Sequence, residues 1–123
     1  MNRTDEETYY KLTDMKKKLN SFFRELRKNG FFARQNFWCC QTCASSDIAT
    51  NFKDKSNKFV YYHKQDTQGL EEDGNRVLIA FDGDSKLICE IARRNRLLTN
   101  WNGDKSTRIE LIDIEGGLKW MKN

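Results

Sequence analysis

Apolar residues recur at helical spacing in the first thirty positions. Steps of three and four residues place five of them on one face of a helix: Leu12, Met15, Leu19, Phe22 and Leu26. Most positions between them are charged or polar, and Asn29-Gly30 is a typical helix stop. The pattern predicts an amphipathic N-terminal helix within residues 1–29.

Short aromatic and β-branched runs after Gly30 predict strands. The runs are 31–37, 58–63 and 76–82, and the last is apolar on both faces, as expected of a central strand. The segments 97–101 and 107–114 are predicted to form a hairpin, because they flank the turn dipeptide Asn102-Gly103. In an alternative interpretation the loop of this hairpin is longer and extends through Lys105. A turn or short helix is predicted over 40–53, and 68–75 has the composition of an acidic surface connection.

A second main helix is predicted after "FDGDS", with Asp84 or Ser85 as its cap. Its inward face would carry Leu87, Ile88, Ile91 and Ala92. The order α-β-(α)-β-β-α-β-β predicts an α+β fold. We therefore expect residues 1–123 to form a single domain, a mostly antiparallel sheet of about five strands with two main helices packed on it.

Composition narrows the class of protein. Hydrophobic residues make up 37% of the chain, with eight Phe, four Tyr and three Trp, which argues against disorder. The 22 Lys and Arg against 18 Asp and Glu give a net charge of +4, less than a dedicated nucleic-acid binder concentrates. No apolar run is long enough for a membrane span, and from its polar composition we expect that the N-terminus is not a secretory signal. We expect a cytoplasmic protein with reduced thiols and no membrane partner.

The "CCQTC" cluster is open to three interpretations. Cys39, Cys40 and Cys43, with His63 as a fourth ligand, have residue types that bind zinc. A helix starting at the cluster would activate a thiol for disulfide exchange, but the chain has no proline to supply the cis-proline of thioredoxin-like enzymes. Free cysteine is also a common core residue, and packing without a cofactor is the favoured interpretation, for Cys89 as well.

Other polar and charged residues could form a site. A polar motif combines Arg34, Gln35 and Asn36 with Gln65, Asp66 and His63, as a catalytic site or as a structural network, and the network is favoured. No nucleophile–base pair emerges, so no catalytic residue is predicted.

Basic clusters are expected on both main helices. They consist of Lys16, Lys17 and Lys18, and of Arg93, Arg94 and Arg96. Such clusters meet phosphates or acidic partners, although most are merely the solvated faces of helices. Trp120, in the tail 115–123, is a further candidate for a partner contact.

Three separated motifs resemble an uncharacterised bacterial family. "ARQNFWCCQTC", "YYHKQD" and "WNGDKSTRIEL" are similar, in order, to its Ala-Arg-Gln-x-Phe-x-Cys-Cys-x-x-Cys, Tyr/Phe-x-His-x-Gln and Trp-Asp/Asn-Gly patterns, over roughly residues 30–112. Two departures are Ala44 in place of a glycine and "EEDGNR" before the central strand. The family is a domain of unknown function. If its motifs form a site, the resemblance implies these positions: Arg34, Gln35, Cys39, Cys40, Cys43, His63, Gln65, Asp66 and Trp101.

The sequence favours a small non-enzymatic binding protein that docks on a protein or nucleoprotein partner. Small inhibitors from mobile elements, of the immunity-protein or anti-CRISPR type, share this profile as a class. One alternative is a thiol or zinc site at the cysteine cluster, and another is direct binding of RNA or DNA. We expect no cofactor, and zinc at the cysteine cluster is the alternative.

Overall fold

The computed structural model describes residues 3–115. Its α-helices are α1 (Arg3–Lys28), α2 (Gln41–Asn51), α3 (Gln68–Glu72) and α4 (Ser85–Arg94). Short 3-10 helices are η1 (Lys53–Lys55) and η2 (Lys64–Thr67). The strands are β1 (Phe32–Arg34), β2 (Phe59–Tyr61), β3 (Arg76–Asp82), β4 (Leu98–Asn100) and β5 (Ile109–Ile112). No helix within 3–115 is long and apolar enough to cross a membrane.

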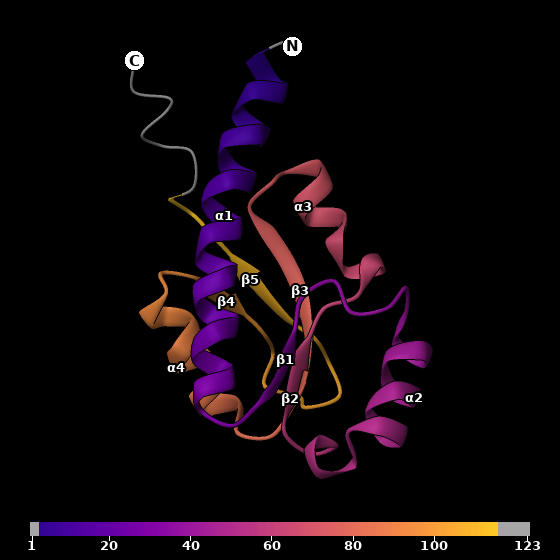
Figure 1. Cartoon of the computed structure of the whole chain (residues 1–123). Helices are drawn as coiled ribbons and strands as arrows, with labels where there is room; N and C mark the ends of the chain where they lie inside the picture. Colours follow the sequence, from indigo (N-terminus) through magenta and orange to yellow (C-terminus); the bar gives the residue numbers. More distant parts are fainter. Residues whose placement is uncertain (1–2, 116–123) are drawn as a thin grey trace.

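The strands form one sheet in the order β1-β2-β3-β5-β4, in which only β1 and β2 are parallel (Figure 1). The long strand β3 pairs with β2 through its C-terminal half and with β5 through its N-terminal half. β2 therefore ends beside the middle of β3. The segment η2–α3 lies along the rest of β3, beyond the end of β2. The predicted α+β class and mostly antiparallel sheet are confirmed.

One face of the sheet carries the main core. Every second residue of β3 points toward α1 and α4, because successive strand residues point to opposite faces. These residues are Val77, Ile79 and Phe81. The predicted apolar stripe of α1 is fully buried against them, from Met15 to Leu26. On α4, Asp84 caps the helix by accepting the backbone N–H of Leu87 at 3.1 Å, as the sequence predicted.

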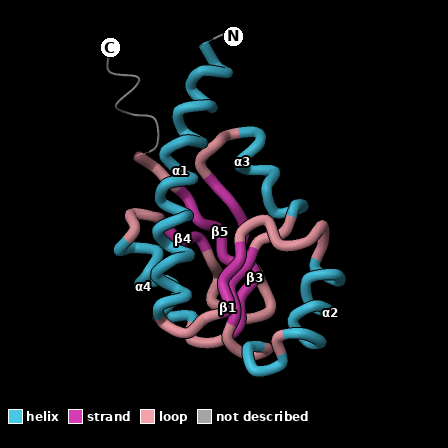
Figure 2. The backbone as a smooth tube through the Cα atoms, in the orientation of Figure 1, coloured by secondary structure: helices cyan, strands magenta, loops and turns pink. Residues whose placement is uncertain are grey.

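The opposite face is covered over only half its width. Ala44 and Ile48 of α2 pack there with Phe32, Tyr61 and Ala80. Figure 2 shows α2 on the far side of the strands from α1 and α4. On the β3-β5-β4 half, which we call the open half of the sheet, α3 borders β3 at one side and Leu98 of β4 is 50% exposed. The outward residues of the open half follow from the register: Arg76, Leu78, Leu98, Asn100, Glu110 and Ile112.

Three local expectations differ from the structure. The strand predicted over 31–37 ends at Arg34, because Asn36 and Trp38 adopt positive φ angles of 51° and 64°. The predicted connection 68–75 contains the short helix α3, whose Leu70 is buried. The last two strands are joined by a loop from 101 to 108, so the longer loop is correct.

Candidate functional site at the cysteine cluster

The segment that precedes α2 lies against the segment that follows β2. The backbone N–H of Phe37 donates to the carbonyl of Tyr62 at 2.7 Å, and the N–H of Lys64 donates to the carbonyl of Trp38 at 3.1 Å. These bonds bring the "ARQNFWCCQTC" and "YYHKQD" motifs together, although some twenty residues separate them. The bonds therefore fix the backbone on both sides of the cysteine cluster.

Three thiols meet at the start of α2. The Sγ of Cys39 lies 3.8 Å from that of Cys40 and 3.9 Å from that of Cys43, and all three sulfurs lie within 4.8 Å of one another. Cys39 and Cys43 are exposed and Cys40 is half-buried. The packing interpretation of these three residues is therefore wrong, because the inner face of α2 is made by Ala44 and Ile48. Cys89, in contrast, packs against the core as expected.

The surroundings of the cluster shift the pKa values of Cys40 and Cys43 in opposite directions. Cys40 is the N-cap of α2, and the backbone N–H of Cys43 is the main cause that lowers the pKa of Cys40, with the two neighbouring thiols adding to it. Hydrogen bonding to Cys40 and Cys39 and their negative charge raise the pKa of Cys43 to about 11. Cys40 thus ionises more readily than Cys43, and its thiolate is stabilised by the free amides of the first helical turn.

Arg108 ties the cluster to a buried polar network. Its Nε lies 2.9 Å from Asp66 Oδ1, and its terminal nitrogen donates to His63 Nε2 at 2.8 Å and to Gln41 Oε1 at 3.0 Å. Gln41 directly follows Cys40 and opens α2. One guanidinium in the "WNGDKSTRIEL" motif therefore contacts both other motifs. The sequence analysis missed Arg108, because a charged residue that alternates with apolar ones in a predicted strand is normally expected to face solvent.

His63 serves this network and is not a thiol partner. The group of donors close enough to share one ion, among the described residues, consists of the three cysteines alone. Because Arg108 donates to Nε2, that nitrogen carries no proton and the ring is neutral. Burial is the main cause that lowers the pKa of His63, Asp66 opposes it and Arg108 adds to it. Nδ1 lies 3.3 Å from Asp66 Oδ2 without the geometry of a hydrogen bond. The structure does not support His63 as a fourth metal ligand.

The remaining polar motif residues are dispersed. Arg34 lies over the rings of Phe32 and Phe52 at 5.2 and 5.9 Å, a cation–π contact. Gln35 bridges Asn20 and the hydroxyl of Tyr62. These contacts join the cysteine segment to the sheet and to α1.

Three further motif residues take other roles. Asn36 is exposed in the turn, and Gln65 is exposed beside a pocket. Trp101 packs edge-on against Phe81 and donates to the loop carbonyl of Asp104. Trp101 therefore shapes the 101–108 loop that carries Arg108.

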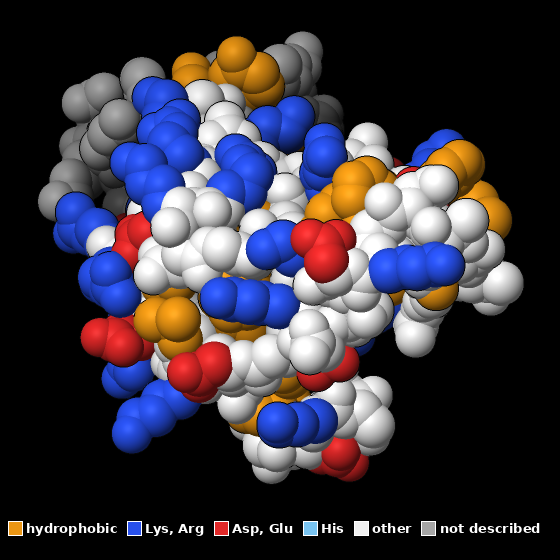
Figure 3. All heavy atoms as spheres, turned by 60° about the horizontal axis from the view of Figure 1, so that its bottom comes forward, with side chains coloured by type: hydrophobic (Ala, Val, Ile, Leu, Met, Phe, Trp, Pro, Cys, Tyr) orange, Lys and Arg blue, Asp and Glu red, His pale blue; other side chains and the backbone are white. Residues whose placement is uncertain are grey.

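Half of the predicted basic surface is engaged within the molecule. Lys18 pairs with Asp113 at 2.6 Å, Arg94 pairs with Glu25, and Arg96 pairs with Glu115 at 2.7 Å. Lys16, Lys17 and Arg93 are exposed. Figure 3 shows Lys and Arg side chains spread over one face with Asp and Glu side chains between them. Trp120 lies outside the described residues.

Comparison with known proteins gives a family and no activity. The sequence matches the family described as a domain of unknown function (DUF6891) over residues 1–122. The chain belongs to this family. The match extends beyond the 30–112 segment in which the motifs occur and includes α1. No curated protein and no solved structure matches the chain significantly.

Proposed function

We propose that the protein binds one soft divalent metal ion, best matched by Zn²⁺, through Cys39, Cys40 and Cys43. The spacing of the sulfurs carries this proposal. In a tetrahedral site with Zn–S bonds of about 2.3 Å, two sulfur ligands lie about 3.8 Å apart. The two separations of Cys39 Sγ from its neighbours, 3.8 and 3.9 Å, agree with this value.

The electrostatics of the cluster favour a bound cation. Hydrogen bonds with Cys40 and Cys39, followed by the negative charge of these two thiols, raise the pKa of Cys43 to about 11, so the three thiols do not all ionise near neutral pH without a cation. A metal ion replaces the thiol protons and removes the repulsion. Cys40 would supply a thiolate more readily than Cys43, because its pKa is lowered whereas that of Cys43 is raised.

The donor set selects the type of metal. Three thiolates suit zinc and other soft ions, whereas Mg²⁺ and Ca²⁺ require oxygen ligands. Three protein ligands leave one tetrahedral position open, which is typical of sites that bind or activate a further ligand rather than of closed structural zinc sites. The exposure of Cys39 and Cys43 supports this open arrangement.

Cobalt(II) titration tests the proposal, because tetrahedral Co²⁺–thiolate sites absorb in the visible and near ultraviolet. The reduced full-length chain should develop these bands with one equivalent of Co²⁺ and lose them when Zn²⁺ is added. Cys40→Ser and Cys43→Ser should weaken the bands and the affinity, whereas Cys89→Ser, a cysteine outside the cluster, should leave both unchanged. Identical titrations of wild type and Cys43→Ser, or a Cys40–Cys43 disulfide formed in place of a metal complex, would contradict it.

A second candidate function is docking on a protein partner, supported by the open half of the sheet. Leu78 is 38% exposed and Leu98 is 50% exposed on this face, with Ile112 half-buried between their strands. The three strands span about 10 Å, the width of one α-helix. We propose that an amphipathic helix of a partner protein packs there, as α2 packs on the other half.

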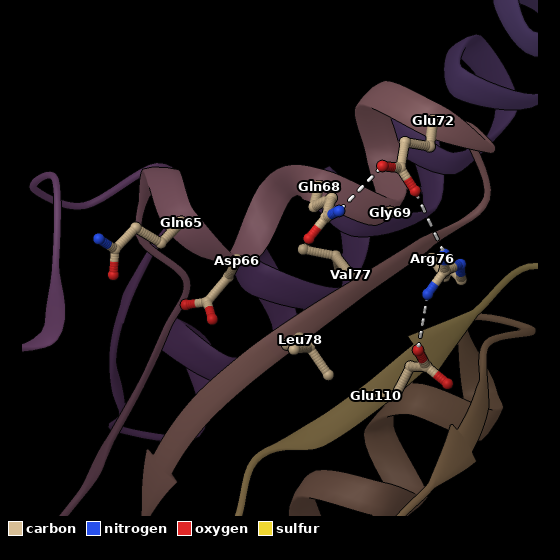
Figure 4. Close-up of a pocket in the computed structure, with 9 residues that line it drawn as sticks. All are labelled: Gln65, Asp66, Gln68, Gly69, Glu72, Arg76, Val77, Leu78 and Glu110. Atoms are coloured by element: carbon tan, nitrogen blue, oxygen red, sulfur yellow. Dashed lines mark hydrogen bonds and ion pairs between the residues drawn. The ribbon is translucent and has the colours of Figure 1, made fainter.

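A polar pocket beside Leu78 specifies the charge of that helix. The pocket has a volume of about 310 Å³ and lies between α3 and the strands β3 and β5 (Figure 4). Glu72 and Glu110 lie on either side of Arg76, and Asp66 also belongs to the pocket lining. Asp66 is already paired with Arg108. Glu72 and Glu110 outnumber the guanidinium of Arg76, so a Lys or Arg of the partner helix fits this end. An inhibitor of the immunity-protein or anti-CRISPR type would act through such a surface.

Site-specific photo-crosslinking in source cells tests this candidate. A benzophenone side chain at position 98 should crosslink to one protein, in a helical segment with a basic residue, and Leu78→Asp should abolish the product. Position 93 on α4 is the matched exposed control. Crosslinks from 93 and not from 98 would refute docking at the open half, and crosslinks from 93 to nucleic acid would favour RNA or DNA binding instead.

A further inference from the structure

We infer that the open metal position takes the thiolate of a small aminothiol, a molecule with one thiol and one primary amine, held in a groove beside Trp38. This inference rests on the proposed metal site and names the ligand class of that site.

The groove adjoins the thiol cluster directly. It has a volume of about 460 Å³ and is lined by one face of α2 together with Trp38. Cys43 belongs to this lining and to the sulfur cluster. A ligand bound to the metal next to Cys43 therefore extends into the groove. Hydroxyl groups of Thr42 and Ser46 line its sides.

Trp38 forms the wall of the groove in a strained conformation. Its φ of 64° lies in the left-handed region, which costs a residue other than glycine about 1–2 kcal/mol. The residue stays 51% exposed, so burial of the ring offsets only part of this cost. The indole N–H donates to Asp47 Oδ2 at 2.9 Å, which holds the ring over the groove. Strain at an exposed aromatic residue is typical of ligand contacts.

Asp47 supplies a fixed negative charge on the same face of α2. It follows Cys43 by four residues, so their β-carbons lie about 5–6 Å apart. The side chain of Asn51 donates a hydrogen bond to the other carboxylate oxygen of Asp47 at 2.5 Å. This bond is the main cause that lowers the pKa of Asp47, and the bond from Trp38 is the next. An ammonium group two carbons from a metal-bound sulfur reaches this carboxylate and the face of the indole ring. It gains an ion pair and a cation–π contact there.

Charge balance also selects an aminothiol. A divalent ion with three thiolates carries one net negative charge, and a fourth thiolate adds another. The ammonium group of the ligand compensates one of these charges, whereas a carboxylate group would add a third. In the binding step the thiol S–H bond breaks, its proton passes to bulk water, and its sulfur replaces a metal-bound water molecule. No atom is oxidised or reduced.

The test uses the Co²⁺-loaded full-length chain, in which an added thiolate ligand changes the charge-transfer band. Three probes are titrated: cysteamine, which is cationic, 2-mercaptoethanol, which is neutral, and mercaptoacetate, which is anionic. Affinities are compared per thiolate present at the working pH. Cysteamine should bind tightest and mercaptoacetate weakest. Asp47→Asn should weaken cysteamine about two- to fivefold and leave 2-mercaptoethanol nearly unchanged. Asp54→Asn, an exposed carboxylate in η1, is the matched control and should change neither affinity.

Each result separates this inference from the metal proposal. If no cobalt–thiolate spectrum forms, the metal site itself is wrong. If the spectrum forms and no probe alters it, the fourth position takes no thiol and the inference fails. Loss of cobalt to the probes also overturns it. Equal binding of all three probes, unaffected by Asp47→Asn, overturns the aminothiol class.

Discussion

Arg108 connects the three motifs, and its replacement has a calculable cost. Arg108→Met removes the ion pair at 2.9 Å from Asp66, whose side chain is only 4% exposed. Removing one partner of a buried ion pair costs about 3–5 kcal/mol, because the other charge remains uncompensated. The Arg108 side chain is 21% exposed, so water reaches part of the pair and the lower end applies. We expect a loss of about 3 kcal/mol in the free energy of unfolding.

Urea denaturation followed by circular dichroism measures this loss. Arg108→Lys keeps the charge but cannot reach Asp66, His63 and Gln41 together, so its cost should be about 1–2 kcal/mol. A double-mutant cycle with Asp66→Asn should give a coupling energy of about 1–3 kcal/mol. Arg93→Met, on the exposed face of α4, is the matched control and should cost less than about 0.5 kcal/mol.

Two results would refute the role of Arg108. The first is a cost equal to that of Arg93→Met. The second is an additive cycle, which would mean that Asp66 and Arg108 stabilise the fold independently of each other.

Further predictions concern other buried groups. Lys18→Met should cost about 2–4 kcal/mol of unfolding free energy, because it leaves the fully buried Asp113 carboxylate without its cation; the exposed neighbour Lys17→Met should cost under about 0.5 kcal/mol in the same urea assay. The free energy of unfolding should fall as the pH drops below 6.5, the ordinary pKa of histidine. The pKa of His63 is lowered in the folded protein, so the unfolded chain takes up a proton that the folded ring does not. His63→Gln should flatten this slope, and an unchanged slope would assign it to other groups. Gly74→Ala should lower the thermal midpoint, because φ is 79° and a β-carbon would lie 2.6 Å from a carbonyl oxygen of α1; an unchanged midpoint would contradict this close approach of Gly74 to α1.

Local sequence signals predicted the helix α1 from its helical spacing of apolar residues and the strand β3 from its continuous apolar run. The stripe of α1, the apolar strand β3 and the cap at Asp84 needed no tertiary information. Helix α3 could not be predicted, because its five residues carry no stripe and include Gly69. That glycine is required by packing, since a β-carbon there would meet the backbone of Arg76 at 2.6 Å.

The site was only half predictable, because spacing locates thiols but does not orient them. "CCQTC" indicated that two or three sulfurs could share an ion. Their exposure depends on Ala44 and Ile48 turning α2 toward the sheet, which the cysteine spacing does not show. The role of Arg108 depends on a loop that brings residue 108 beside residues 41, 63 and 66. Such contacts between distant segments leave no local pattern.

Zinc K-edge X-ray absorption on the reduced, zinc-loaded full-length chain tests the central claim most directly. The proposed site predicts three sulfur ligands at about 2.3 Å and one lighter oxygen or nitrogen ligand. Zinc surrounded only by oxygen and nitrogen, or a chain that retains no zinc while its three thiols are reduced, would contradict the account.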